Sequence, residues 1–384
     1  MRLTGDWLTD PRTLRVFDAI EDSGHRLYYV GGVVRNAALG LPVSDIDLST
    51  DARPEVVTEA VEARGLKAVP TGVDHGTVTV VSDGLAHEVT TFRHDVETDG
   101  RRAVVAFSDR LEDDAARRDF TINALYADRR GVVIDPVGGL ADLAHRRLRF
   151  VGDAEARIRE DYLRILRFFR FHAHYADTGA GFDPDTLAAI AANAGGIETL
   201  SAERTGREML RLLEADDPAP ELATMAAVGV LDRVLPGADA AIVARLVDLE
   251  EGEVPDDLRR LAALGGENAA ERLRLSRAET RRLALLRKGV ESGAGLAEVA
   301  WREGADTAWD VARLRAAATG TQLAPDTSAR IERGAKAEFP LRPDDLMPTY
   351  EGAALGARLA ELEARWIASG FSKSRDELLA LPDN

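Results

Sequence analysis

The chain has 384 residues and no cysteine, which excludes a disulfide framework, thiolate metal sites and a cysteine nucleophile. Lysine and arginine together number 49 against 66 acidic residues, and the resulting net charge of −17 by itself argues against a nucleic-acid partner. No segment approaches the roughly 18 apolar residues of a membrane span, and the N-terminus lacks a secretory pattern. We therefore expect a cytoplasmic protein without membrane contact.

The predicted elements fall into two regimes along the chain. Up to about residue 150, β-rich runs alternate with short helical patterns. The predicted strands are 26–30, 46–50, 77–82, 86–92 and 132–134, and the predicted helices are 33–39, 54–64 and 119–127. From about residue 153 the strand signal ends, and apolar residues three and four apart predict helices to the C-terminus. The fold class is thus α+β, a mixed sheet followed by helices.

The first candidate motif is a predicted strand that runs into Gly31 and Gly32 and then into a helix with Arg35 in its first turn. Glycine lets the backbone approach a ligand closely, and the free N–H groups at a helix start attract an anion. A structural turn with a surface arginine remains the alternative.

Two carboxylates follow on the next predicted strand. Asp45 and Asp47 are two residues apart and share one face, where their oxygens could hold a hard divalent cation. Glu88, on the strand predicted at 86–92, is a candidate third carboxylate. The alternatives are a polar edge strand for the first pair and an exposed strand residue for Glu88.

A third motif opens the helix predicted at 119–127. Two arginines, the second being Arg118, precede Asp119, and Asn123 lies one turn later on the same face. A plain N-cap role for Asp119 is the alternative.

The fourth motif places Asp161, Arg164, Arg167 and Arg170 along one predicted helical stripe beside an apolar face. An aspartate and an arginine one turn apart can accept from an amino group and donate to a ring nitrogen, the pattern that cytosine and adenine share. An intrahelical ladder of ion pairs is the alternative.

In order and spacing these motifs resemble the class II tRNA nucleotidyltransferase and poly(A) polymerase family. The resemblance covers about residues 26–215 and includes two further motifs, an Asp135-Pro136-Val137-Gly138-Gly139 segment with Asp142, and Glu203-Arg204 with Glu208. It implies a polymerase-β-like nucleotidyltransferase head at 1–150, a helical neck with the nucleotide-selecting helix at 151–217, and a helical body and tail that binds tRNA at 218–384. The only His-Asp doublet is His94-Asp95, so no HD phosphohydrolase domain is expected.

The resemblance also implies roles for single residues. Asp45 and Asp47 would hold two Mg²⁺ ions, Gly32 and Arg35 would bind the triphosphate of CTP or ATP, and Arg118 would be a further nucleotide contact. Asp119 would read the ribose 2′-hydroxyl, Asp161 and Arg164 would select C and A, and Arg167 and Arg170 would complete the contacts. Residues 93–114 resemble a flexible loop of the family, and Asn36 stands where the family commonly has aspartate.

The implied activity is the template-independent addition of C, C and A to the 3′ end of tRNA, with release of pyrophosphate. A poly(A) polymerase and an enzyme adding only CC or only A remain open, as does the oligomeric state. Two basic islands lie in the acidic chain, at 146–170 and 259–288. The second is the candidate for gripping the tRNA backbone, through Arg259, Arg260, Arg274, Arg277, Arg281 and Arg282. A solvated helix face is the alternative.

Overall fold

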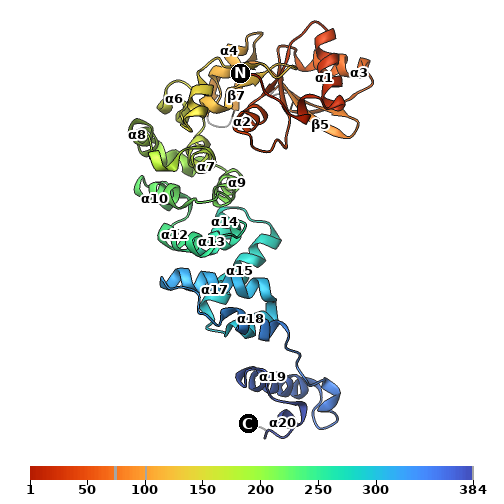
Figure 1. Cartoon of the computed structure of the whole chain (residues 1–384), viewed down its shortest axis with the longest axis vertical. Coiled ribbons are helices and arrows are strands. Elements are labelled where there is room, and N and C mark those ends of the chain that lie inside the picture. The colour runs from red at the N-terminus through yellow and green to blue at the C-terminus, as the bar shows by residue number, and fades with distance from the viewer. Residues whose placement is uncertain (73–75, 100–101, 383–384) are drawn as a thin grey trace. The chain divides into compact units, whose positions relative to one another are not determined.

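The computed structural model describes residues 1–72, 76–99 and 102–382 (Figure 1). Contacts divide the chain into two compact units. One comprises residues 1–212 and 220–234, and the other comprises residues 213–219 and 235–384. The finer division into a head, a neck and a body with tail stays a prediction.

The first unit is built on a seven-stranded mixed sheet with the order β3-β4-β5-β2-β1-β8-β9. Its strands are β1 (Leu27–Val30), β2 (Asp47–Thr50), β3 (Lys67–Gly72), β4 (Thr77–Ser82), β5 (Leu85–Thr91), β8 (Tyr126–Ala127) and β9 (Val133–Ile134). Only the central β2–β5 pair is parallel, and the other neighbours are antiparallel. The five predicted strands are confirmed within one or two residues.

Helices cover this sheet and connect its strands. α1 (Pro11–Asp22) and α3 (Pro54–Ala63) pack on each other (Figure 1). α1 also packs against β4, and α3 also packs against β3 and β4. Asp10 caps α1 by accepting from the backbone N–H of Arg12 at 2.8 Å, and Pro11 occupies the first helical position, where it has no N–H to lose. The remaining helices of this part are α2 (Gly32–Leu39), α4 (Leu111–Ala116) and α5 (Gly139–Ala144).

One sequence prediction in this part is wrong, and a second segment has more regular structure than its motif indicated. Residues 119–127 form no α-helix: Phe120 bridges to Phe150, a 3₁₀ turn spans Thr121–Asn123, and β8 follows. Residues 93–114, which resemble the family's flexible loop, contain β6 (Arg93–Asp99) and β7 (Arg102–Phe107) where the structure describes them. These strands pair as a separate two-stranded sheet, and α4 follows them. In residues 119–127 the backbone hydrogen bonds are made with partners distant in sequence, and in β6 and β7 they are made with the adjacent strand.

Beyond β9 the described residues form helices and turns, as predicted, and take part in two isolated bridges, Phe120–Phe150 and Ala238–Gly265. The helices up to residue 234 are α6 (Ala154–Glu160), α7 (Leu163–Tyr175), α8 (Pro184–Asn193), α9 (Ala202–Leu213), α10 (Ala219–Ala227) and α11 (Leu231–Val234). α7 buries Ile165, Leu166, Phe168 and Phe169, so one of its sides belongs to the core.

The second unit is helical. It contains α12 (Ala240–Leu249), α13 (Asp257–Leu264), α14 (Ala269–Arg272), α15 (Arg277–Glu291), α16 (Leu296–Glu303), α17 (Ala305–Thr319), α18 (Thr327–Ala335), α19 (Gly352–Ala368) and α20 (Arg375–Leu379). Two apolar clusters stabilise it, one around Val311 and Ile331, and one around Leu362 and Trp366. Among the described residues no helix is both long and apolar enough to cross a membrane.

Candidate active site

The strand pairing brings three of the candidate motifs to one edge of the sheet. β1 ends at Val30, and its antiparallel neighbour β2 begins there with Asp47. The parallel register places Asp47 directly beside Glu88 of β5. Gly31 adopts a φ of 68°, a left-handed conformation that favours glycine, and turns the chain from β1 into α2 at this same edge.

The carboxylates at this edge are close enough to affect one another. Burial, the Glu88 carboxylate and Asp45 all raise the pKa of Asp47, against the opposing effect of Arg118. The Asp47 and Asp45 side chains nevertheless remain open to solvent, and Ser44 donates to Asp45 at 3.2 Å. No ready-made group of three metal-ligating side chains is present among the residues described. The hard oxygen donors and their mutual repulsion fit a divalent cation, which would offset that repulsion.

Arg35 lies buried behind the glycine turn. Its Nη1 donates to Asn123 at 2.5 Å, and its Nη2 donates to Asn36 at 2.9 Å and to the Tyr175 hydroxyl at 2.8 Å. The guanidinium carbon also lies 4.0 Å from the centre of the Tyr175 ring and 5.2 Å from that of Phe171. Asn36 thus supplies the acceptor for which the family commonly uses aspartate.

Arg118 is held in place by a buried carboxylate that lies outside the candidate motifs. Asp114 of α4 is fully buried and pairs with Arg118 at 2.9 Å and with Arg117 at 2.6 Å. The Tyr126 hydroxyl donates to Asp114 at 2.7 Å. Burial opposes ionisation of Asp114, but the two guanidiniums outweigh it and hold its pKa well below the usual range. The signal in the sequence was an aspartate three and four residues before two arginines.

Asp119 and Arg167 form the next layer of the site. Asp119 accepts from Arg167 Nε at 2.8 Å, from Asn123 at 3.0 Å and from the backbone N–H of Phe120 at 2.8 Å. Although burial alone would raise it, the pKa of Asp119 is lowered by Arg167 and Asn123. Arg170 forms an ion pair with Glu208 at 2.6 Å. The two arginines therefore pair with carboxylates of other elements rather than along their own helix.

Asp161 does not lie on the same helix as Arg164. α6 ends at Glu160 and α7 begins at Leu163, and Asp161 adopts an extended conformation between them. Its carboxylate accepts from the backbone N–H of Leu163 at 3.1 Å and from Arg204 at 2.5 Å. The predicted single stripe is therefore wrong, because a turn separates the aspartate from the arginines.

Arg164 is also engaged by the protein itself. Its guanidinium donates to Glu160 at 2.6 Å and to the backbone carbonyls of Arg157 and Arg117 at 3.0 and 3.1 Å.

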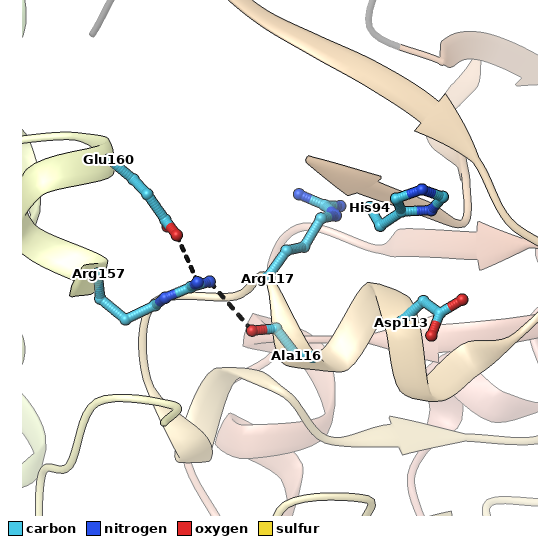
Figure 2. Close-up of a pocket in the computed structure, with 6 residues that line it drawn as sticks. All are labelled: His94, Asp113, Ala116, Arg117, Arg157 and Glu160. Carbon is cyan, nitrogen blue, oxygen red and sulfur yellow. Dashed lines mark hydrogen bonds and ion pairs between the residues drawn. The ribbon is translucent and has the colours of Figure 1, made fainter. Parts of the chain in front are cut away.

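A pocket of about 440 Å³ adjoins this group, between β6, α4 and α6 (Figure 2). Figure 2 shows Arg157 reaching both Glu160 and the carbonyl of Ala116, where it donates at 3.1 Å. The described residues that line the pocket are His94, Asp113, Ala116, Arg117, Arg157 and Glu160.

The second unit holds the arginines predicted to grip RNA, and the structure separates them into two kinds. Arg259 and Arg260 are 5% and 2% exposed, and both pair with the buried Glu250. These two predictions are wrong, because the side chains are structural and do not reach the surface. Arg274, Arg277 and Arg281 are exposed, and Arg282 is half-buried against Asp256 and Asp310.

Comparison with known proteins agrees with this arrangement. Residues 27–149 match the family model of the poly A polymerase head domain, and residues 181–242 match that of the probable RNA and SrmB-binding site of polymerase A. The mitochondrial CCA tRNA nucleotidyltransferase 1 of Mus musculus is 32% identical over 381 residues, covering 93% of this chain and 86% of the mouse protein. The chain belongs to the CCA tRNA nucleotidyltransferase family.

Other members of the CCA tRNA nucleotidyltransferase family are also similar to this chain, over different shares of its length. The CCA-adding enzyme of Geobacillus thermodenitrificans is 40% identical over 228 residues, which cover 59% of this chain and 54% of that enzyme. The crystal structure of the Bacillus stearothermophilus CCA-adding enzyme in complex with CTP superposes with a TM-score of 0.77 at 29% identity, covering 95% of this chain and 94% of that one. The nucleotidyltransferase fold predicted from the motifs is therefore confirmed.

Proposed function

We propose that this protein adds C, C and A to the 3′ end of tRNA, using CTP and ATP and releasing pyrophosphate. The observation that carries the proposal is family membership along nearly the whole chain, together with the convergence of the glycine turn, the carboxylates and the arginines at one sheet edge. The cytoplasmic location stays a prediction, because the relatives include bacterial and mitochondrial enzymes.

The glycine turn and its arginines bind the triphosphate in this proposal. Gly32 opens α2, whose first N–H groups are free to bind an anion, and Arg35 lies in the first turn. Arg118 supplies a second cation that Asp114 orients. Preorganised donors of this kind stabilise the charge that develops on the phosphates as the bond to pyrophosphate breaks.

Asp45 and Asp47, with Glu88 beside them, would hold Mg²⁺. When bound, the metal would activate the RNA 3′-hydroxyl and neutralise phosphate charge. The chain's own contribution is to hold the carboxylates on one sheet edge next to the glycine turn, so that the hydroxyl and the triphosphate are brought together.

Arg164, Arg167 and Arg170, with Asp119 and Asp161, select the nucleotide. Asp161 and Arg164 offer one acceptor and several donors to the base edge, in addition to the bonds that they make to Arg204 and Glu160. Asp119 is the candidate for reading the ribose hydroxyl, and in the structure it also holds Arg167 in place.

One assay tests the function. Purified protein, Mg²⁺ and a tRNA ending at its discriminator base are incubated with each labelled nucleotide alone and in combination, with an EDTA arm. We expect three added nucleotides that require both CTP and ATP, and no addition with EDTA. Long A tails would indicate a poly(A) polymerase, stops after CC or a requirement for a CC end would indicate a partial enzyme, and no extension would refute the proposal.

The same assay tests base selection. Arg164→Ala removes the proposed donor and should raise misincorporation of UTP and GTP, whereas Arg159→Ala removes an exposed arginine of α6 that pairs with Glu155 and should leave selection unchanged. Unchanged selectivity in the Arg164 variant would exclude the base-reading role.

A further inference from the structure

Tyr175 and Arg35 meet although 140 residues separate them in sequence. Tyr175 is the last residue of α7, the helix that carries Arg164, Arg167 and Arg170, and Arg35 is in the first turn of α2. The tyrosine contacts the arginine twice, because its hydroxyl accepts at 2.8 Å and its ring faces the guanidinium at 4.0 Å. No family motif in the sequence includes this residue.

The partners of Arg35 differ in charge from those of the other proposed nucleotide-binding arginines. Arg118, Arg164, Arg167 and Arg170 each pair with a carboxylate. The three side-chain acceptors of Arg35 are neutral, namely two amide oxygens and the Tyr175 hydroxyl. A guanidinium held by neutral oxygens and an aromatic face keeps its full charge for an anion.

We propose that Tyr175 is a positioning residue that aims Arg35 at the triphosphate of the incoming nucleotide. This inference rests on the proposed function. Tyr175 fixes the guanidinium without neutralising it, so the cation is in place before the nucleotide binds. Because the triphosphate is common to CTP and ATP, Tyr175 acts equally on both and takes no part in reading the base.

The test removes the hydroxyl and keeps the ring. Tyr175→Phe removes a hydrogen bond to a charged group, and such a bond contributes to nucleotide binding by holding Arg35 in place. The KM for CTP and the KM for ATP should therefore rise by the same factor, on the order of tenfold. The inhibition constant of inorganic pyrophosphate, which has no base, should rise by a similar factor. The choice between CTP and ATP should stay as in the wild type.

A matched control exists in the same unit. The Tyr29 hydroxyl is buried and has no hydrogen-bond partner among the residues described, so Tyr29→Phe makes the same chemical change without disturbing Arg35. A double-mutant cycle adds a second readout. In an Arg35→Ala background, Tyr175→Phe should have no further effect on the KM or on pyrophosphate inhibition.

The outcomes separate this inference from the proposed function. A wild type that extends no tRNA refutes the function. A wild type that extends tRNA, with a Tyr175→Phe variant whose KM and pyrophosphate inhibition are unchanged, refutes the positioning role alone. A loss confined to one nucleotide, or an undiminished effect in the Arg35→Ala background, also refutes it.

Discussion

At the residue scale, the candidate site is a network in which most arginines are held by carboxylates of other elements. Asp114 of α4 orients Arg118, Asp119 orients Arg167, and Glu208 of α9 pairs with Arg170. Long flexible side chains lose little further entropy on binding when such partners already hold them. The site is therefore preorganised by charge pairs that are themselves shielded from water.

Asp114 gives this network a measurable pH dependence. Its pKa is lowered from an ordinary value of 3.8, so its contribution to stability is complete well above that value and declines as the pH falls below it. Asp114→Asn should reduce the free energy of unfolding at pH 7 by about 3 kcal/mol, because two guanidiniums lose their shared partner.

Denaturant unfolding between pH 7 and pH 3 measures this effect. The variant should lose less stability on acidification than the wild type, since it lacks the titrating group. Asp113→Asn, on the preceding residue, is the matched control. Parallel pH profiles of wild type and Asp114→Asn would contradict the assigned role.

At the element scale, local patterns predicted most strands and missed what depends on distant partners. The alternation in Thr77–Ser82 is visible in a short window, and β4 has those bounds. In residues 119–127 the apolar spacing also suited a helix, but Phe120 pairs with Phe150, and Tyr126 with Ile134. Such non-local pairing overrides local propensity.

The same distinction holds for the site. The glycine turn and the Asp45–Asp47 spacing are local and could be predicted, and the register then places Asp47 beside Glu88. The burial of Arg259 and the contact of Tyr175 with Arg35 arise from tertiary packing and leave no local signal.

α15 carries most of the exposed arginines that the sequence predicts to bind RNA. A Ser276–Glu279 capping box starts it, and Arg277 and Arg281 lie four residues apart on one exposed face. Arg277→Glu with Arg281→Glu should weaken tRNA binding and lower the slope of log affinity against log salt by about 2, one for each phosphate contact.

Filter binding at several salt concentrations measures this slope. The control is Arg330→Glu with Arg333→Glu on α18, which makes the same change of net charge on exposed arginines of the same unit. An equal loss in both double variants would show a general charge effect and contradict a specific role for α15.

At the scale of the whole molecule, the two compact units have separate apolar cores. Trp366 is 2% exposed and packs with Trp301, Phe339 and Phe371 at ring distances of 5.4, 5.4 and 4.8 Å. Trp366→Ala should lower the free energy of unfolding of the second unit by about 3 to 5 kcal/mol.

Calorimetry measures this prediction. We expect the wild type to unfold in two thermal transitions, and we expect CTP to raise the midpoint temperature of only one of them. Trp366→Ala should lower the midpoint temperature of the other transition only. A shift of both transitions, or a single cooperative transition, would contradict the independence of the units.

The pairs Asp119–Arg167 and Arg35–Tyr175 have a consequence for recombination between relatives. Each joins a residue before position 150 to one after it, so a chimera that exchanges only residues 1–150 would combine interacting side chains from two different parents. A crossover near residue 235, the last boundary between the compact units, would transfer both pairs intact, together with residues 213–219 of the second unit. Grafting the proposed catalytic part of this protein onto another body therefore requires residues 35–175 to come from one parent.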